Sequence, residues 1–454
     1  MAIAIQNGSV CLGDRIEKTD ILVAGGKIAE VGSLSALKNA DQIIDATGLY
    51  VLPGLIDIHT HLDDRIAGCD LADSYATGTE IAIRNGITTI CNFITQVKNE
   101  TLADAIAKAE NKAEGNCYAN YAWHLTPTSF SDEDWLQIEN SIDAGFKTFK
   151  FYTTYKHAGI YCSYEQLEAL FRRLTPRGFQ FLVHCEDAEI LARQTAEMEQ
   201  HGDLSKPIAH AQLRPVAAEV EAIRRVVELA RRYQSRVHIV HVSTPEGAVL
   251  IQQAKENAPI TCETAPHYLF LSDWMLRRPD GHRWICSPPL RSEEERALLV
   301  RKAEEECFDL YATDHCAFRL SDKDAPFTDV RTVPNGLSGI GSLSHLIFKL
   351  FEKDVPYSLR QMCLHLAENP ARLLGQFPRK GSIRRGADAD LVVLNPAGTP
   401  KPLRSSLMDV CETYEGMTST LECAHVLLAG KEVVRNGELM DAKSRTGRWL
   451  YGSG

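Results

Sequence analysis

The stretch PGLIDIHTHLD, residues 53–63, sets a short apolar run directly before two histidines. An apolar run of this length after Pro-Gly is typical of a buried β-strand. Residues i and i+2 of a strand point to the same side, so His59 and His61 direct two imidazoles to one point. Imidazole binds zinc and similar divalent metals, although a surface or capping role is the alternative for such a pair taken alone.

Further apolar runs follow through the middle of the chain, separated by segments with helical spacing. SYEQLEALFRRLTPRG (163–178) and VEAIRRVVELARRY (220–233) place apolar residues three and four apart. Strand and helix alternating eight times is the pattern of a parallel (β/α)8 barrel. The predicted strands are GLIDIH (54–59), GITTICNF (86–93), NYAWHLT (120–126), TFKFY (148–152), FLVHCE (181–186), VHIVHVS (237–243), ITCETAPH (260–267) and LYATDH (310–315).

Both ends of the chain instead carry β-hairpin patterns, in which glycine interrupts short β-like runs. GSIRRGADADLVVLNP (381–396) and HVLLAGKEVVRNGEL (425–439) repeat near the end the pattern of the first residues. This suggests that the two ends meet. We therefore predict an α/β protein with a (β/α)8 barrel over residues 53–375. Residues 1–52 and 376–454 would together form a small β-sandwich domain.

Composition narrows the classes of partner. The 454-residue chain has a formal net charge of -11, which argues against non-specific nucleic-acid binding. No apolar run reaches the ~20 residues that span a bilayer, and the first residues read as a strand rather than a signal peptide. The 13 cysteines are scattered without a framework spacing, which favours reduced thiols. We expect a cytoplasmic protein with no nucleic-acid or membrane partner.

Polar side chains also fall in several of the later predicted strands. Catalytic groups of a barrel cluster at the C-terminal ends of its strands. Together with the first histidine pair, these groups favour a metal site at the barrel mouth. Glu186, which closely follows His184, fits a hydrogen-bond partner of that histidine better than a metal ligand. The groups are Lys150 in the fourth run, His184 in the fifth, His241 in the sixth and Asp314 in the eighth.

Lys150 is the unusual member because a protonated lysine cannot bind a cation. Its apolar strand, TFKFY, also disfavours the charge. One solution is carbamylation, in which the deprotonated lysine adds carbon dioxide and becomes an anion with two oxygens. Such a group can bridge two metals. The alternative is a lysine whose head reaches solvent and pairs with an acid.

Ten motifs occur in order along nearly the whole chain. They are PGLIDIHTHLD (53–63), GFKTFKFYTTY (145–155), VHCEDAE (183–189), IVHVST (239–244), ETAPHYL (263–269), CSPPLRS (286–292), ATDHCAF (312–318), VPNGLSGI (333–340), YEGMTS (414–419) and GKEVVRNGE (430–438). With these motifs the chain resembles the amidohydrolase superfamily, and within it the hydantoinase and dihydropyrimidinase branch.

The resemblance implies an enzyme that hydrolyses a small cyclic amide, opening a hydantoin or dihydropyrimidine ring to an N-carbamoyl amino acid. It implies two divalent metal ions, with zinc expected, and a hydroxide bridging them as the nucleophile. Two ligand pairs and a bridge are carried over from the family motifs. His59 and His61 would bind one ion, His184 and His241 the other, and carbamylated Lys150 would bridge them.

The same resemblance assigns the remaining site residues. Asp314 would bind the first metal and transfer the proton. Tyr155 would stabilise the oxyanion. Ser287 and Asn335 would hold the cyclic amide through their backbone groups. A homotetramer, or at least a homodimer, is also implied.

The substrate within the superfamily stays open at this point. Dihydroorotases that resemble this family usually carry an arginine just after the histidine pair, which suits a substrate carboxylate. This chain has Asp63 and Asp64 there, with Arg65 next. Allantoinase and other cyclic-ureide hydrolases are alternatives, although CSPPLRS and VPNGLSGI look more like hydantoinase loops. A non-catalytic homologue is disfavoured because every ligand position is filled.

Overall fold

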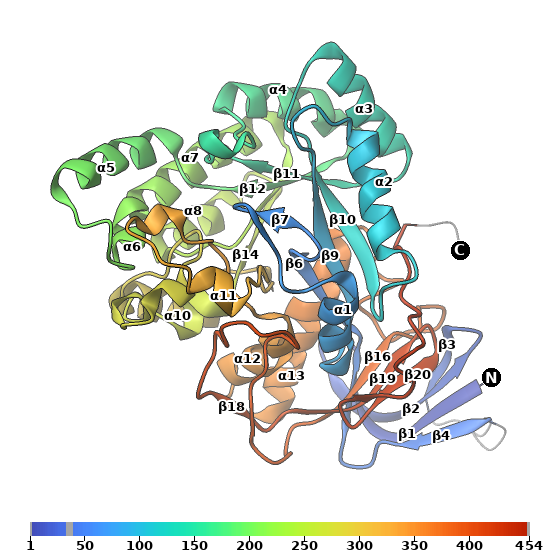
Figure 1. The fold of residues 1–454 in the computed structure, drawn as a ribbon. Coiled ribbons are helices and arrows are strands. Elements are labelled where there is room, and N and C mark those ends of the chain that lie inside the picture. The colour runs from blue at the N-terminus through green and yellow to red at the C-terminus, as the bar shows by residue number, and fades with distance from the viewer. Residues whose placement is uncertain (1, 33–39, 452–454) are drawn as a thin grey trace.

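The computed structural model describes residues 2–32 and 40–451 and contains the parallel barrel predicted from the sequence (Figure 1). The eight predicted runs form one 8-stranded parallel sheet in sequence order. A parallel bridge between Thr60 and His315 joins its two ends. The strands are β6 (Leu55–Thr60), β9 (Ile87–Thr95), β10 (Asn120–Thr126), β11 (Thr148–Tyr152), β12 (Gln180–His184), β13 (Arg236–Ile239), β14 (Ile260–Thr264) and β15 (Leu310–Tyr311).

Helices follow the strands, and several of them begin at a serine that caps the helix N-terminus. Ser74, Ser131 and Ser163 each cap a helix with a reciprocal capping box, which satisfies two otherwise free backbone N–H groups. The helices are α1 (Tyr75–Arg84), α2 (Leu102–Ala113), α3 (Asp132–Asp143), α4 (Tyr164–Leu174), α5 (Ala188–His201), α6 (Ala209–Leu213), α7 (Val216–Tyr233), α8 (Pro245–Ala254), α9 (Pro266–Phe270), α10 (Glu293–Glu304), α11 (Leu320–Lys323), α12 (Leu343–Leu350), α13 (Val355–Cys363) and α14 (Asn369–Leu373).

Strand β11 shows how alternation positions a functional side chain. Every residue of TFKFY is buried. Phe149 and Phe151 belong to the large core that the strands share with the surrounding helices. Lys150 lies between them in sequence, so alternation turns it to the barrel interior. It pairs in register with Leu182, one strand further round the barrel.

The two ends of the chain meet in one 9-stranded sheet, which fits the small β domain predicted for them. Antiparallel pairing of β5 with β16 joins the two halves, and Val51 lies opposite Val393. Figure 1 shows the red C-terminal strands beside the blue N-terminal ones. We retain the domain boundaries near residues 52 and 375 as a proposal. The strands are β1 (Ala2–Cys11), β2 (Ile16–Ala24), β3 (Lys27–Gly32), β4 (Gln42–Asp45), β5 (Tyr50–Pro53), β16 (Leu391–Asn395), β19 (Glu422–Leu428), β20 (Lys431–Arg435) and β21 (Glu438–Leu439).

A C-terminal segment leaves this sheet and returns to the barrel. The backbone N–H of Tyr121 donates to the carbonyl of Arg448 at 3.0 Å, and that of Leu450 donates to Tyr121 at 2.8 Å. Leu450 packs into an apolar cluster with Ile56 and Leu310, which lie at the starts of their strands. The segment therefore covers the end of the barrel opposite the strand ends that carry polar groups.

Two small antiparallel sheets of two strands each complete the described strands, β7 (Arg65–Ile66) with β8 (Cys69–Asp70) and β17 (Lys401–Pro402) with β18 (Thr418–Ser419). All 13 cysteines are free thiols. Within residues 2–32 and 40–451, none of the helices has the length and apolar character needed to cross a bilayer.

Candidate metal centre

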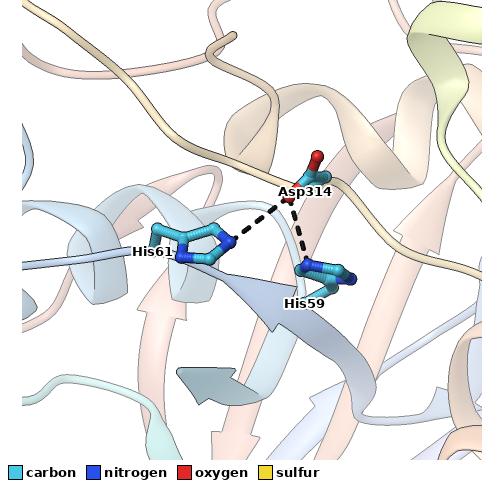
Figure 2. A group of neighbouring side chains, drawn as sticks. All are labelled: His59, His61 and Asp314. Atoms are coloured by element: carbon cyan, nitrogen blue, oxygen red, sulfur yellow. Dashed lines mark ion pairs between the residues drawn. The ribbon is translucent and has the colours of Figure 1, made fainter. Parts of the chain in front are cut away.

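Three predicted ligands lie together in Figure 2, His59 and His61 from the end of the first barrel strand and Asp314 from the loop after the last. Nε2 of His59 lies 3.1 Å from Oδ1 of Asp314, and Nε2 of His61 lies 3.4 Å from the same oxygen. One ligand atom from each residue lies within 4.8 Å of the other two. Ligand atoms on a tetrahedral zinc are separated by roughly 3.3 Å, so this spacing suits a divalent ion.

His184 and His241 form a second pair next to the first group. Nδ1 of His184 lies 2.9 Å from Nε2 of His241. The rings of His241 and His59 are 5.4 Å apart between centroids, so the two groups adjoin. Nδ1 of His241 is buried and has no hydrogen-bond partner among the described residues. Five predicted side chains thus converge in two adjacent groups.

His241 and Asp314 lie beyond the strands that the sequence predicts to carry them. Strand β13 ends at Ile239 and β15 ends at Tyr311. Both residues have left-handed backbone, with φ of 38° and 49°, which is uncommon for residues other than glycine. Their side chains reach the site because of these turns, and strand alternation does not explain their direction.

Lys150 lies between the two histidine groups. Its Nζ is 5.0 Å from the ring centroid of Phe93 and 5.1 Å from that of Tyr152. Phe93 packs on His59 at 4.7 Å, and Tyr152 packs on His184 at 5.6 Å. Lys150 is only 1% exposed, which excludes the alternative of a lysine whose head reaches solvent.

Burial controls the protonation of these side chains. It lowers the pKa of His61, His184 and His241, so these imidazoles are held in the neutral form that binds metals. Burial also lowers the pKa of Lys150 to about 8, although the charge of Asp314 opposes this. A lysine with a lowered pKa exposes more of the nucleophilic free amine.

Sequence reasoning missed Glu263, at the end of β14. Its buried carboxylate lies 2.5 Å from Nδ1 of His59 and accepts the backbone N–H of His241 at 3.3 Å. With Nδ1 engaged by this carboxylate, Nε2 of His59 remains for a metal. Nε2 of His238 lies 3.1 Å from the same carboxylate, although alternation alone turns His238 away from His241. The available signal was a carboxylate within the apolar run ITCET, because a buried charge needs partners.

Glu263→Gln should weaken metal binding about 10- to 100-fold, the usual cost of losing a partner that orients a histidine ligand. The amide keeps the shape of the side chain but cannot accept at both positions. Metal content after dialysis against graded chelator measures the effect. Glu246→Gln, on the exposed face of α8, is the control and should behave as the wild type. Full metal retention by Glu263→Gln at every chelator concentration would contradict the role.

Glu186 plays the corresponding part for His184, as the sequence indicates. Its Oε2 lies 2.7 Å from Nε2 of His184, which leaves Nδ1 facing His241. Arg214, which was not predicted, donates from Nε to Oε1 of Glu186 at 3.0 Å. The guanidinium carbon also lies 5.2 Å from the ring centroid of Tyr155. Arg214 therefore links a partner of one predicted ligand to the predicted oxyanion residue.

The predicted substrate residues lie at the same mouth. The ring of Tyr155 is 5.2 Å from that of His184, and its backbone is left-handed with φ of 65°. Burial raises the pKa of Tyr155 to about 12, although Arg214 and Ser287 lower it, so the phenol stays a donor. Nδ2 of Asn335 donates to Oγ of Ser287 at 3.2 Å, which joins the two loops.

These residues fit a pair of divalent ions. The donor set of four imidazoles and a carboxylate suits zinc, and also manganese, cobalt and iron. The buried Nδ1 of His241 without a partner is unusual for a structural histidine, because buried polar atoms are normally hydrogen-bonded. Burial lowers the pKa of His61, His184 and His241, so these three imidazoles stay neutral and can bind cations.

Comparison with known proteins agrees with this geometry. A sequence model of the amidohydrolase family matches residues 50–433. The chain is 31% identical to a D-hydantoinase of Ralstonia pickettii, over 96% of each protein. It is also 31% identical to a D-hydantoinase of Streptomyces coelicolor, over 97% of this chain and 96% of the relative.

Solved structures give the same result. The crystal structure of dihydropyrimidinase from Brevibacillus agri superposes with a TM-score of 0.94 at 31% identity, covering 100% of this chain and 99% of the other. A structure titled L-hydantoinase (dihydropyrimidinase) from Arthrobacter aurescens gives a TM-score of 0.86 at 26% identity, with 97% of both chains covered. The chain therefore belongs to the amidohydrolase family, in its hydantoinase and dihydropyrimidinase branch.

Proposed function

We propose that this chain hydrolyses an amide bond of a hydantoin or dihydropyrimidine ring and releases an N-carbamoyl amino acid. The observation that carries the proposal is the meeting of four imidazoles, a carboxylate and a buried lysine at the barrel mouth. The D-hydantoinase relatives support the cyclic amide as the substrate class.

The proposed ions, with zinc expected, would be held by two sets of residues. His59, His61 and Asp314 would hold one, and His184 with His241 the other. When bound, such ions supply Lewis acidity, which activates water and polarises the ring carbonyl. Zinc is favoured by the imidazole-rich donor set.

Lys150 is proposed to bridge the two ions as a carbamate. The lysine nitrogen forms a bond to the carbon of carbon dioxide and gives up a proton, leaving one negative charge over two oxygens. Two observations support this step. The side chain is buried between the histidine groups, and in the described ranges it has no ion-pair or hydrogen-bond partner.

The remaining side chains handle the substrate and its protons. The Asp314 carboxylate would accept the proton of the attacking water and return it to the leaving ring nitrogen. The Tyr155 phenol would donate to the oxygen that becomes negative during attack. Ser287 and Asn335 would hold the ring amide through their backbone groups.

The contacts of Asp63 and Arg65 support a substrate other than dihydroorotate. Asp63 turns its carboxylate to the backbone N–H of Tyr75 at the start of α1, at 3.0 Å. Arg65 is 68% exposed at its side chain and pairs with Asp70 at 3.2 Å. Arg65 is thus engaged on the surface hairpin and does not supply the guanidinium that a substrate carboxylate needs.

A substrate panel tests the proposal directly. Purified protein is incubated with hydantoin, dihydrouracil, allantoin and dihydroorotate, and ring opening is followed by loss of ring absorbance. We expect the highest kcat/KM with hydantoin or dihydrouracil, and no turnover of dihydroorotate. Chelation should abolish activity and Zn²⁺ should restore it. Ca²⁺, which prefers oxygen ligands, should not.

Two outcomes would refute parts of the proposal. Full activity after exhaustive chelation would show that the reaction needs no metal ions. Preference for allantoin or dihydroorotate would place the substrate in another class. The homotetrameric or homodimeric state and the cytoplasmic location stay predictions. Sedimentation of the purified protein measures the oligomeric state.

A further inference from the structure

Lys323 is a buried lysine outside the predicted site. It ends the short helix α11 and is 2% exposed. Burial lowers its pKa to about 8. Within the described part of the chain it pairs with no carboxylate, which is rare for a buried charge. A cation placed there costs folding free energy, so its position calls for another reason.

Its ammonium group holds two loops together. Nζ donates to the carbonyl of Ile285 at 2.9 Å and to the carbonyl of Pro334 at 2.7 Å. Ile285 lies two residues before Ser287, and Pro334 lies directly before Asn335. The two loops that carry the proposed substrate contacts are therefore tied at one nitrogen.

Two further bonds complete the connection. The backbone N–H of Gly336 donates to the carbonyl of Ile285 at 3.0 Å. Nδ2 of Asn335 donates to Oγ of Ser287 at 3.2 Å. Lys323 is the only charged member of this set of contacts, and hydrogen bonds from a charged donor are roughly twice as strong as neutral ones.

We propose that Lys323 is a positioning residue that sets the distance between the Ser287 and Asn335 loops and so the grip on the substrate amide. This inference rests on the proposed function for its catalytic consequence. Both hydrogen bonds of the Lys323 ammonium group go to loop carbonyls and neither to a metal-site residue, so its loss should change substrate binding and leave the ions in place. A displacement of about 1 Å between positioning groups can cost up to about a hundredfold in rate.

Lys323→Met tests the inference because methionine keeps the length and apolar stem but cannot donate. We expect KM to rise about tenfold or more, with a smaller change in kcat and an unchanged metal content. Lys323→Arg, which can still donate to both carbonyls, should recover part of the loss. An unchanged KM in Lys323→Met would overturn the proposal.

Lys380→Met is the matched control. Lys380 is also buried, at 7% exposure, but it pairs with Asp388 at 3.1 Å and also with Asp390. Asp388 bridges to Lys27 of the small sheet at 2.5 Å, so this lysine serves the joining of the two chain ends in that sheet. Its loss should lower Tm without raising KM. An equal rise of KM in both variants would mean that buried lysines here act only through stability, and the proposal would fail.

Hydrogen exchange separates this inference from the proposed function. Lys323→Met should speed exchange in residues 285–288 and 333–336 relative to the wild type, and Lys380→Met should not. This measurement needs no turnover. If the wild type opens no ring in the panel, the proposed function fails while faster exchange still supports the tie. Unchanged exchange in Lys323→Met overturns the tie whatever the panel shows.

Discussion

Replacing Lys150 with alanine is expected to remove at least one of the two proposed ions and to lower kcat about a thousandfold or more. Its Nζ lies between the rings of Phe93 and Tyr152, which pack on the two histidine groups, so its removal takes away the proposed bridge between them. Lewis acidity contributes several kcal/mol to the stabilisation of a transition state, and each 1.36 kcal/mol is tenfold in rate. Metal content per chain and kcat for the best ring substrate are measured together.

Lys147→Ala is the control for this variant. Lys147 lies three residues before Lys150 and is exposed, so its loss should leave both metal content and kcat unchanged. Added short carboxylic acids should restore part of the activity of Lys150→Ala, since they offer two oxygens to the same space. Full metal occupancy in Lys150→Ala would show that the lysine is not a bridge.

Asp314→Asn is expected to keep the ions and lose at least about a hundredfold in kcat, the scale of a positioned acid or base. The asparagine side chain keeps the shape and one oxygen near His59 and His61 but cannot carry a proton between water and the leaving nitrogen. The closeness of Oδ1 to both imidazoles supports the first half of this expectation, that the ions stay in place. Metal content and the pH profile of kcat check it.

Asp143→Asn provides the comparison, because among the described residues the side chain of Asp143 makes a surface ion pair with Arg177 at 2.7 Å and lies outside the site. Surface pairs of this kind contribute little, so its activity should equal that of the wild type. Wild-type turnover by Asp314→Asn would show that Asp314 does not transfer the proton. Loss of both ions from Asp314→Asn would show that the lost activity reflects metal binding by Asp314 and not proton transfer.

The barrel could be predicted because its strands are apolar runs buried on both faces, and such runs are readable without any tertiary information. The meeting of the two chain ends was readable for a similar reason, since both carry hairpin patterns. The positions at which the strands end could not be predicted from the sequence. Strands β13 and β15 stop before His241 and Asp314, because the backbone turns to left-handed conformations that no local pattern announces.

The site was predicted where a residue type is rare in its setting. A lysine inside TFKFY and two histidines after GLIDI stand out in sequence. Glu263 is visible only as a carboxylate within ITCET, and Arg214 does not stand out at all, because the roles of both depend on partners far away in the chain. Glu263 reaches His59 across 204 positions, and that contact exists only after the barrel closes.

The pairing of β5 with β16 has a consequence for biosynthesis. Pro53 and Leu391 are partners, yet the entire barrel is translated between them. Until β16 emerges, β5 is an uncovered sheet edge bearing Val51 and Leu52, a template for pairing with other chains. Long-range pairing of this kind forms slowly. Slower translation or added chaperone should therefore raise the soluble yield of this chain more than changes at its surface.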